Sequence, residues 1–219
     1  MANQIPYTPG YWTIPDVSYR GRILTVDLLD GLLPAMTQEQ ASAHAKANPN
    51  GFITRDLPMY FAIFRALEQQ RTQLDVSAPV AFLKESMQYN WLQTLTAIDY
   101  TPRGKLDIVT HGVGTEKPYS QEADVVGPDG QITQEDRACL AALLGTGDVK
   151  TINRVSAYIN NTPAYLLRVN ANPSEVDRCV VRFRSCADWV YLYCSRRPQD
   201  SDPALGVRRV APLSGARKR

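Results

Sequence analysis

The segment from Val176 to Cys194, VDRCVVRFRSCADWVYLYC, constrains the fold more than any other part of the chain. β-Branched and aromatic residues dominate both of its halves, which is typical of strands on a half-buried pleated surface. The residues between the halves, Ser185 to Asp188, predict a short turn. The sequence therefore predicts a β-hairpin and, with it, an antiparallel sheet near the C-terminal end of the chain.

The side chains of this hairpin can be assigned to two faces, because successive strand residues point to opposite sides of a sheet. With Arg184 opposite Trp189, one face takes the aliphatic residues and Cys179 lies opposite Cys194. The other face collects arginine and aromatic residues, which are Arg178, Arg182, Arg184, Trp189, Tyr191 and Tyr193. Such side chains stack on bases and contact phosphates. We therefore predict that these six residues, the arginine-aromatic face, bind a ligand.

Charge is distributed unevenly along the 219 residues, although the net charge is only +2. Residues 150–219 carry 13 Lys+Arg against 5 Asp+Glu, and residues 1–149 carry 11 against 17. A basic C-terminal part favours nucleic acid or another anionic ligand as the partner. The alternatives are that the basic part packs against the acidic part of the same chain, or that its arginines are merely solvated.

Three helices are expected between residues 37 and 96. Each begins at a residue that can cap its first turn: Thr37, Asp56 and Ser77. Thr37 also has a glutamine three residues later, which completes a capping-box pattern. The third helix is expected to extend to about Leu95, because its apolar residues recur at helical spacing.

These elements predict an α+β fold, with an N-terminal helical part followed by a mixed region and a C-terminal antiparallel β-rich part. Residues 1–36 are expected to form an extended arm and a first strand, in which 22–26 is the strand and 27–33 begins a helical turn. Residues 37–96 are expected to form a helical subdomain. Residues 97–219 are expected to form an α+β part that ends in the hairpin and a short basic tail.

The best candidate for a catalytic residue is His111, which follows an expected strand and precedes the glycine-rich segment Gly112–Gly114. A loop of this kind can present backbone N–H groups to a phosphate. The imidazole could act as an acid or base with a carboxylate such as Asp107 or Asp99. The pattern lacks the third glycine of a dinucleotide fingerprint and the Gly-Lys-Ser/Thr of a P-loop. A surface turn with an exposed histidine is the alternative.

Several other function classes find no support in the sequence. The 4 cysteines have neither Cys-x-x-Cys nor zinc-ribbon spacing, so no metal and no cofactor is expected. The apolar runs are much shorter than the roughly 20 residues that span a bilayer. The N-terminus lacks the basic and apolar regions of a signal peptide. We therefore expect a cytoplasmic protein that is not attached to a membrane.

The segment from Pro203 to Val210, PALGVRRV, comes after a Trp-containing strand. In this respect the C-terminal part resembles the final strands of some C-type-lectin-like domains of the formylglycine-generating type. The surrounding motifs of that family are absent. The resemblance implies a scaffold that binds a ligand or a partner.

Together these features favour a non-catalytic binding or interaction protein that uses the arginine-aromatic face, with nucleic acid, a sugar or a protein as its ligand. An enzyme with a site at the His111 glycine loop is the first alternative. A structural or assembly protein is the second, with the same face buried against the acidic helical part or against another copy in a homo-oligomer. What covers Arg182 and Tyr191 in the folded chain distinguishes these hypotheses.

Overall fold

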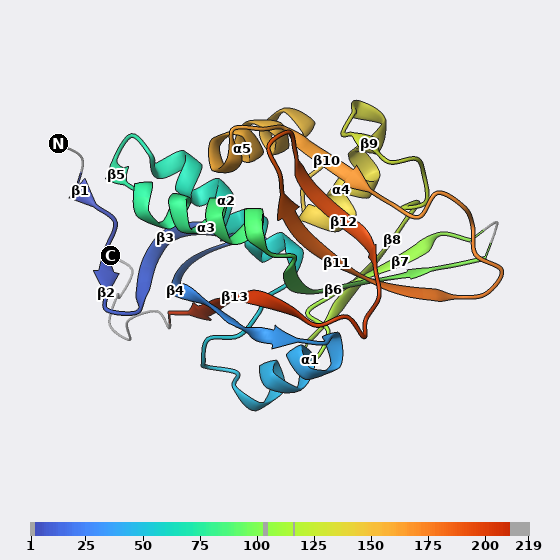
Figure 1. The fold of residues 1–219 in the computed structure, drawn as a ribbon, viewed down its shortest axis with the longest axis horizontal. Coiled ribbons are helices and arrows are strands. Elements are labelled where there is room, and N and C mark those ends of the chain that lie inside the picture. Colours follow the sequence, from blue (N-terminus) through green and yellow to red (C-terminus); the bar gives the residue numbers. More distant parts are fainter. Residues whose placement is uncertain (1–2, 103–104, 116, 211–219) are drawn as a thin grey trace.

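The computed structural model describes residues 3–102, 105–115 and 117–210, and this part of the chain forms five α-helices and thirteen strands. The α+β class predicted from the sequence is confirmed (Figure 1). The helices are α1 (Gln38–Ala47), α2 (Leu57–Gln70), α3 (Ser77–Tyr89), α4 (Arg137–Leu144) and α5 (Val149–Asn160), and the 3-10 turn η1 (Gln134–Asp136) precedes α4. The basic tail expected at 214–219 lies outside the described residues.

The strands form three sheets in the described part of the chain. The smallest pairs β1 (Asn3–Gln4) with β5 (Leu74–Asp75) in parallel. The second has the order β13-β4-β3-β2, with bounds β13 (Asp202–Arg209), β4 (Arg22–Met36), β3 (Tyr11–Tyr19) and β2 (Tyr7–Thr8). The third has the order β8-β7-β6-β11-β12-β10-β9, with bounds β8 (Tyr119–Ala123), β7 (Asp107–His111), β6 (Leu92–Tyr100), β11 (Asp177–Ser185), β12 (Val190–Arg196), β10 (Ala164–Leu167) and β9 (Gly130–Gln131). This third sheet is mixed rather than purely antiparallel, because β10 runs parallel to β12.

The N-terminal residues form a β-sheet rather than an extended arm, so the helices do not begin the fold. The helical turn expected at 27–33 is wrong, because β4 continues from Arg22 to Met36 between β3 and β13. Pairing along both edges satisfies the β4 backbone, which outweighs the local breaker residues. Pro34 has no N–H to donate, and it falls where the pairing of β4 with β13 shifts register, a position that tolerates proline.

The helix α2 is buried along most of its length. Its N-cap is Asp56, whose side chain accepts the Met59 N–H at 3.0 Å, and Pro58 lies in its first turn as the sequence predicts. It packs against β3 on one side and against α4 and α5 on another. The ring of Phe64 lies 5.2 Å from that of Phe183 on β11, which joins α2 to the core face of the hairpin.

The third helix is shorter than expected. The expected cap at Ser77 is wrong, because Ser77 is the first helical residue and the cap residue is Val76, which makes no side-chain cap bond. The helix ends at Tyr89. Residues from Leu92 onward form β6, which lies between β7 and β11 in the seven-stranded sheet. Every residue of β6 from Leu92 to Ile98 is buried. A strand buried on both faces lacks the alternation that identifies a half-exposed strand, and this is why the sequence did not distinguish it from a helix.

The predicted hairpin is present, but its register differs by two residues from the expected one. Phe183 pairs with Leu192 rather than Val190, and Arg184 pairs with Tyr191 rather than Trp189. A shift of two residues keeps each side chain on its face. The aliphatic core face is therefore confirmed, and its buried members are Cys179, Val181, Phe183, Val190, Leu192 and Cys194.

The turn of the hairpin runs from Cys186 to Trp189, and the Cys186 N–H donates to the Trp189 carbonyl at 3.0 Å. A register irregularity between Val180 and Arg182 then shifts the pairing further along β11. The expected pairing of Cys179 with Cys194 is therefore wrong. Both are free thiols, as are the other two cysteines.

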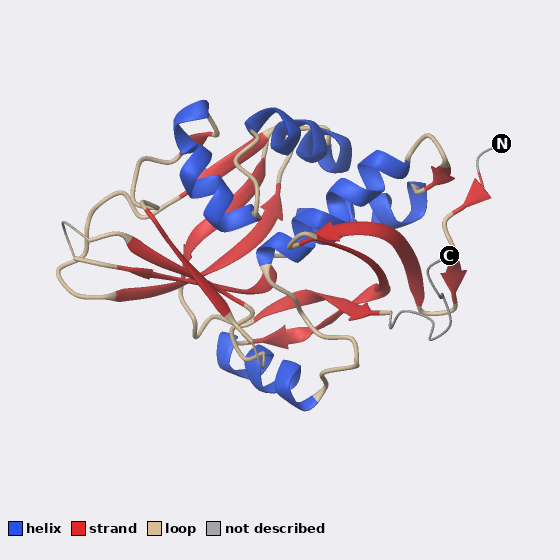
Figure 2. Cartoon of the chain, turned by 180° about the vertical axis from the view of Figure 1, so that it is seen from behind, coloured by secondary structure: helices blue, strands red, loops and turns tan. Residues whose placement is uncertain are grey.

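The helices occupy two sides of the molecule. Figure 2 shows α1 separated from the other helices by strands. The main core includes residues of all three segments predicted from the sequence, whereas a small cluster of Ala41, Ala45, Ile53 and Leu95 lies beneath α1. Within the described ranges, no helix is long and apolar enough to cross a membrane.

Candidate functional site

Arg182, at the centre of the predicted arginine-aromatic face, is fully buried at 0% exposure. Its Nε donates to the Gln93 side-chain oxygen at 2.8 Å, and its Nη2 donates to the Asp200 carbonyl at 2.8 Å. Its guanidinium also forms an ion pair with Asp202 at the start of β13. The chain itself therefore covers Arg182, and the covering carboxylate comes from the last strand rather than from the acidic helical part. A ligand on this face does not reach Arg182.

The other five residues of the face are separated into smaller groups. Arg178 is exposed and pairs with Asp99 at 3.1 Å. Trp189 and Tyr191 pack around Tyr165, with ring centroids at 5.2 and 5.6 Å. Tyr191 pairs with Arg184 across the hairpin and with Tyr165 of β10, so these rings extend the same face of the sheet toward β10.

Arg184 and Tyr193 contact a residue that the sequence did not indicate. The Arg184 guanidinium lies 4.6 Å from the centroid of the Trp91 ring, and the Tyr193 ring also lies 4.6 Å from it. Trp91 immediately precedes β6, whose first residues the sequence patterns assigned to a helix. Ligand binding by this half-buried group stays a prediction.

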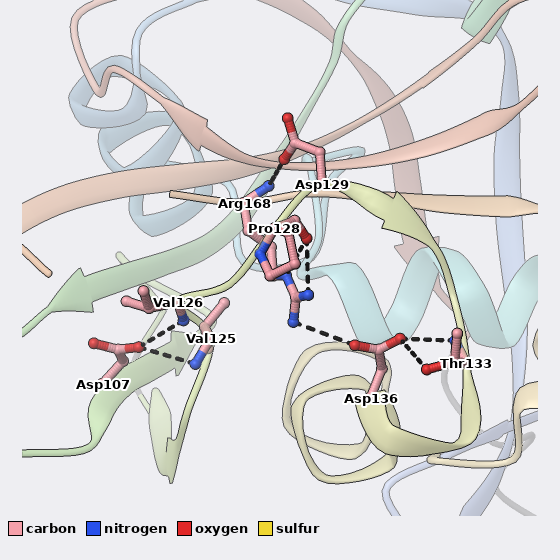
Figure 3. Close-up of polar contacts among 8 residues, drawn as sticks. All are labelled: Asp107, Val125, Val126, Pro128, Asp129, Thr133, Asp136 and Arg168. Atoms are coloured by element: carbon pink, nitrogen blue, oxygen red, sulfur yellow. Dashed lines mark hydrogen bonds and ion pairs between the residues drawn. The ribbon is translucent and has the colours of Figure 1, made fainter. Parts of the chain in front are cut away.

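Much of the basic C-terminal part is paired with the acidic part of the same chain. Four such ion pairs are Arg208–Asp27 at 2.7 Å, Arg178–Asp99 at 3.1 Å, Arg168–Asp136 at 3.2 Å and Arg154–Glu68 at 3.4 Å. Arg168 also donates to the Pro128 carbonyl, which closes the 128–136 loop onto β10 (Figure 3). Packing within the chain therefore accounts for part of the charge asymmetry, as the alternative explanation expected.

His111 is buried at 0% exposure, so the alternative of an exposed surface histidine is wrong. Its Nε2 lies 2.7 Å from the Ala142 carbonyl, which can only accept, so Nε2 carries the proton. Its Nδ1 accepts from the Thr96 hydroxyl at 3.0 Å, and that hydroxyl accepts the Leu57 N–H at the start of α2. Because both ring nitrogens are engaged within the fold, His111 anchors α2 and α4 to the sheet.

The carboxylates named with His111 are bound elsewhere. Asp107 accepts the N–H groups of Val125 and Val126 at 2.9 and 3.3 Å (Figure 3) and that of Thr101 at 2.9 Å. Asp99 pairs with Arg178. The arrangement required by the catalytic hypothesis, a histidine beside one of these carboxylates, is therefore not formed.

Burial lowers the pKa of His111 below its ordinary value. A lowered folded-state pKa means that protonation favours the unfolded chain. The stabilisation that the neutral His111 ring contributes to the folded chain is complete above the pKa of histidine in the unfolded chain, which is about 6.5. It is lost as the pH falls below this value toward the lower pKa of His111 in the folded chain. We expect the free energy of unfolding, measured by urea denaturation, to decrease from pH 7 to pH 5 by at most about 1.4 kcal/mol per pH unit. His111→Gln should flatten this dependence, whereas the control His44→Gln should retain it; equal slopes in both variants would contradict the assignment.

The backbone of the glycine loop is also engaged within the fold. The N–H groups of Gly112 and the next residue both donate to the Leu95 carbonyl, at 2.8 and 3.2 Å. Gly112 and Gly114 have φ angles of +69° and +85°, which favour glycine. A Cβ at Gly114 would lie 2.5 Å from the Cα of Ser42 on α1. Backbone conformation and close packing therefore explain both glycines, and the Gly112 N–H is not available to a phosphate.

A cavity of about 630 Å³ lies beside this loop. Its walls come from the β3–β4 turn, the end of α1, residues 49–56, residues 112–115 and 117–119, and the end of β13. Six basic side chains line it: Arg20, Arg22, Lys46, Arg55, Lys117 and Arg209. We call it the basic cavity.

The positive charge of the basic cavity has little compensation from the protein. None of its six basic side chains forms an ion pair with a carboxylate in the described part of the chain, whereas seven arginines elsewhere do. Among the described lining residues the one carboxylate is Asp56. It already accepts the Tyr19 hydroxyl at 2.6 Å and the Met59 N–H at 3.0 Å. The cavity therefore attracts anions.

Burial and neighbouring charges shift the pKa values of three groups that line the basic cavity. Burial, together with nearby Arg209, lowers the pKa of Arg55 to about 10, so its guanidinium still carries a charge at neutral pH. Burial and the charge of Asp56 raise the pKa of Tyr19 and of Tyr119 well above the ordinary value. Both phenols therefore keep their protons at neutral pH. The lining thus combines cations with neutral hydroxyl groups.

Sequence reasoning missed the basic cavity because its residues come from five separate segments without a shared motif. One local signal was available: Arg20-Gly21 lies between two runs of strand-forming residues, as expected of a two-residue hairpin turn. It would have placed Arg20 and Arg22 together at a sheet end. It carries no information about Lys46 or Arg209.

In the ranges that the structure describes, no group of three His, Cys, Asp or Glu residues is arranged to hold a metal ion. No family model and no solved structure matches the chain. The lectin-like resemblance at 203–210 therefore gains no support from the family comparison. One stretch of 77 residues is 31% identical to a pyruvate decarboxylase from Kluyveromyces marxianus, over 35% of this chain and 14% of that protein. The match spans a small part of that relative's length and does not show a family.

Proposed function

We propose that this chain is a binding protein for a phosphate-bearing anion, which it holds in the basic cavity. The observation that carries the proposal is that six basic side chains line one cavity without an ion-pair partner among the described residues. Like charges that lie close together repel each other, and a bound anion relieves that repulsion. Phosphate suits such a site because its oxygens accept the paired N–H groups of guanidinium.

The proposal keeps the class expected from the sequence, a non-catalytic binding protein, and moves the site away from the hairpin. Arg182 supports this change, because its charge is used within the fold. No arginine of the basic cavity has a carboxylate partner in the described chain, although Arg55 donates to the Val207 carbonyl at 3.2 Å. The enzyme alternative has less support, because His111 lacks a carboxylate partner and both of its nitrogens are engaged.

We expect inorganic phosphate to bind the full chain in isothermal titration calorimetry, with an affinity that falls as salt is added. Replacing exposed cavity residues by Arg22→Gln and Arg209→Gln should weaken binding by about tenfold each, because one charge-assisted contact is lost. The matched control is Arg178→Gln, which makes the same change on an exposed arginine outside the cavity. Absence of phosphate binding, or an equal loss in the control, would contradict the proposal.

A further inference from the structure

A second cavity of about 380 Å³ adjoins the basic cavity. Three residues line both of them: Tyr19, Arg20 and Tyr119. Its other basic residue is Arg65 of α2, and no described residue of its lining is Asp or Glu. We call it the side cavity. It is therefore positively charged like its neighbour, and Arg20 lies in the wall that they share.

Arg20 is held in this wall by a backbone conformation that disfavours arginine. Tyr19 pairs with Arg22, so Arg20 and Gly21 are the two central residues of the β3–β4 turn. Their φ angles are +51° and +71°, a turn geometry that favours Asn-Gly. A side chain other than Asn or Gly is unfavourable in the left-handed region. An arginine in this conformation points to a role for its side chain.

The side chain of Arg20 lies where that role would be performed. Its guanidinium carbon is 3.4 Å from the centroid of the Tyr119 ring and 6.0 Å from that of Tyr19. Stacking on an aromatic ring leaves the edge N–H groups of guanidinium available for hydrogen bonds. Arg20 can therefore donate toward both cavities from one position.

We propose that the two cavities form one bipartite site for a small ligand with two phosphate groups, one in each cavity, with Arg20 between them. The proposal rests on the proposed function, because it places the first phosphate in the basic cavity. Arg65 supplies the separate charge for the second phosphate. Ser18, Gln121 and Thr146 add hydroxyl and amide groups that suit a sugar-like body. Two adjoining cavities favour a compact ligand over a nucleic-acid strand, which needs a groove that follows its backbone.

The experiment compares a hexose 1,6-bisphosphate, a hexose 6-phosphate and inorganic phosphate by isothermal titration calorimetry on the full chain. The wild type should bind the bisphosphate at least about tenfold more tightly than the monophosphate, because a second set of charge-assisted contacts is made. Arg65→Gln should remove this difference, so that the variant binds the bisphosphate no more tightly than it binds the monophosphate. Arg20→Asn should weaken binding of the bisphosphate and should not lower the melting temperature, because asparagine suits the turn. If the role of Arg20 were purely structural, Arg20→Asn would lower the melting temperature and would leave the affinity for the bisphosphate unchanged.

Three outcomes would overturn the inference. Equal affinities for the bisphosphate and the monophosphate, with phosphate binding intact, would exclude the bipartite site and leave the proposed function standing. Failure of all three probes to bind would exclude the proposed function as well. Tighter binding of a single-stranded oligonucleotide than of the bisphosphate, with the same loss on Arg65→Gln, would show that the two cavities follow a nucleic-acid backbone.

Discussion

Replacing Arg182 by methionine is expected to lower the free energy of unfolding by about 3–5 kcal/mol. The guanidinium is fully buried and is bound by Gln93, the Asp200 carbonyl and Asp202. Methionine has a comparable length but no donors, so the substitution leaves the Gln93 and Asp200 oxygens without this donor and leaves Asp202 only its longer ion pair with Arg196, at 3.7 Å. The cost of a buried unpaired charge exceeds the ordinary value of a hydrogen bond. Urea denaturation followed by circular dichroism measures the change.

The matched control is Arg178→Met on the same strand, where the arginine side chain is 47% exposed and pairs with Asp99. An exposed pair of this kind contributes less than about 1 kcal/mol. Arg182→Lys provides a milder test, because it keeps the charge and loses the fork that reaches several acceptors. The free energy of unfolding of Arg182→Lys should lie between those of the wild type and Arg182→Met. If Arg182→Met and Arg178→Met were equally stable, the buried role of Arg182 would be wrong.

Replacing Gly114 by alanine is expected to destabilise the chain by about 2–4 kcal/mol. Two costs add at this position. The φ angle of +85° is unfavourable for a residue with a Cβ, and that Cβ would meet backbone atoms of Ser42 at 2.5 Å. Relief of the overlap requires a movement of the loop or of α1. Since Lys46 of α1 lines the basic cavity, the variant should also bind phosphate more weakly.

Gly10→Ala separates these two costs. Gly10 has a φ angle of +100°, but a Cβ there would meet no atom within 4 Å. It should therefore show only the backbone cost of roughly 1–2 kcal/mol. The difference in unfolding free energy between the two variants measures the packing of the glycine loop on α1. An equal effect of both substitutions would contradict the close approach at Gly114.

The faces of the hairpin illustrate where sequence reasoning succeeded and where it stopped. Alternation assigned the aliphatic face correctly, because the period of two residues is a property of the strand itself. It also placed Arg182 on the opposite face from Phe183. It did not show that Asp202 of β13 and Gln93 of β6 would enclose that arginine. Both partners come from segments that approach β11 only in the folded chain.

The sequence alone determined those features of this protein that depend on residues close together along the chain. The α+β class, the Thr37 and Asp56 caps and the two-faced hairpin depend on contacts between near neighbours, which composition and spacing record. The tertiary structure decided which strands are buried on both faces, which arginines pair with carboxylates and which line the basic cavity. The basic cavity belongs to that second group, because its charges meet from five segments and only the packing of α1, β4 and β13 brings them together.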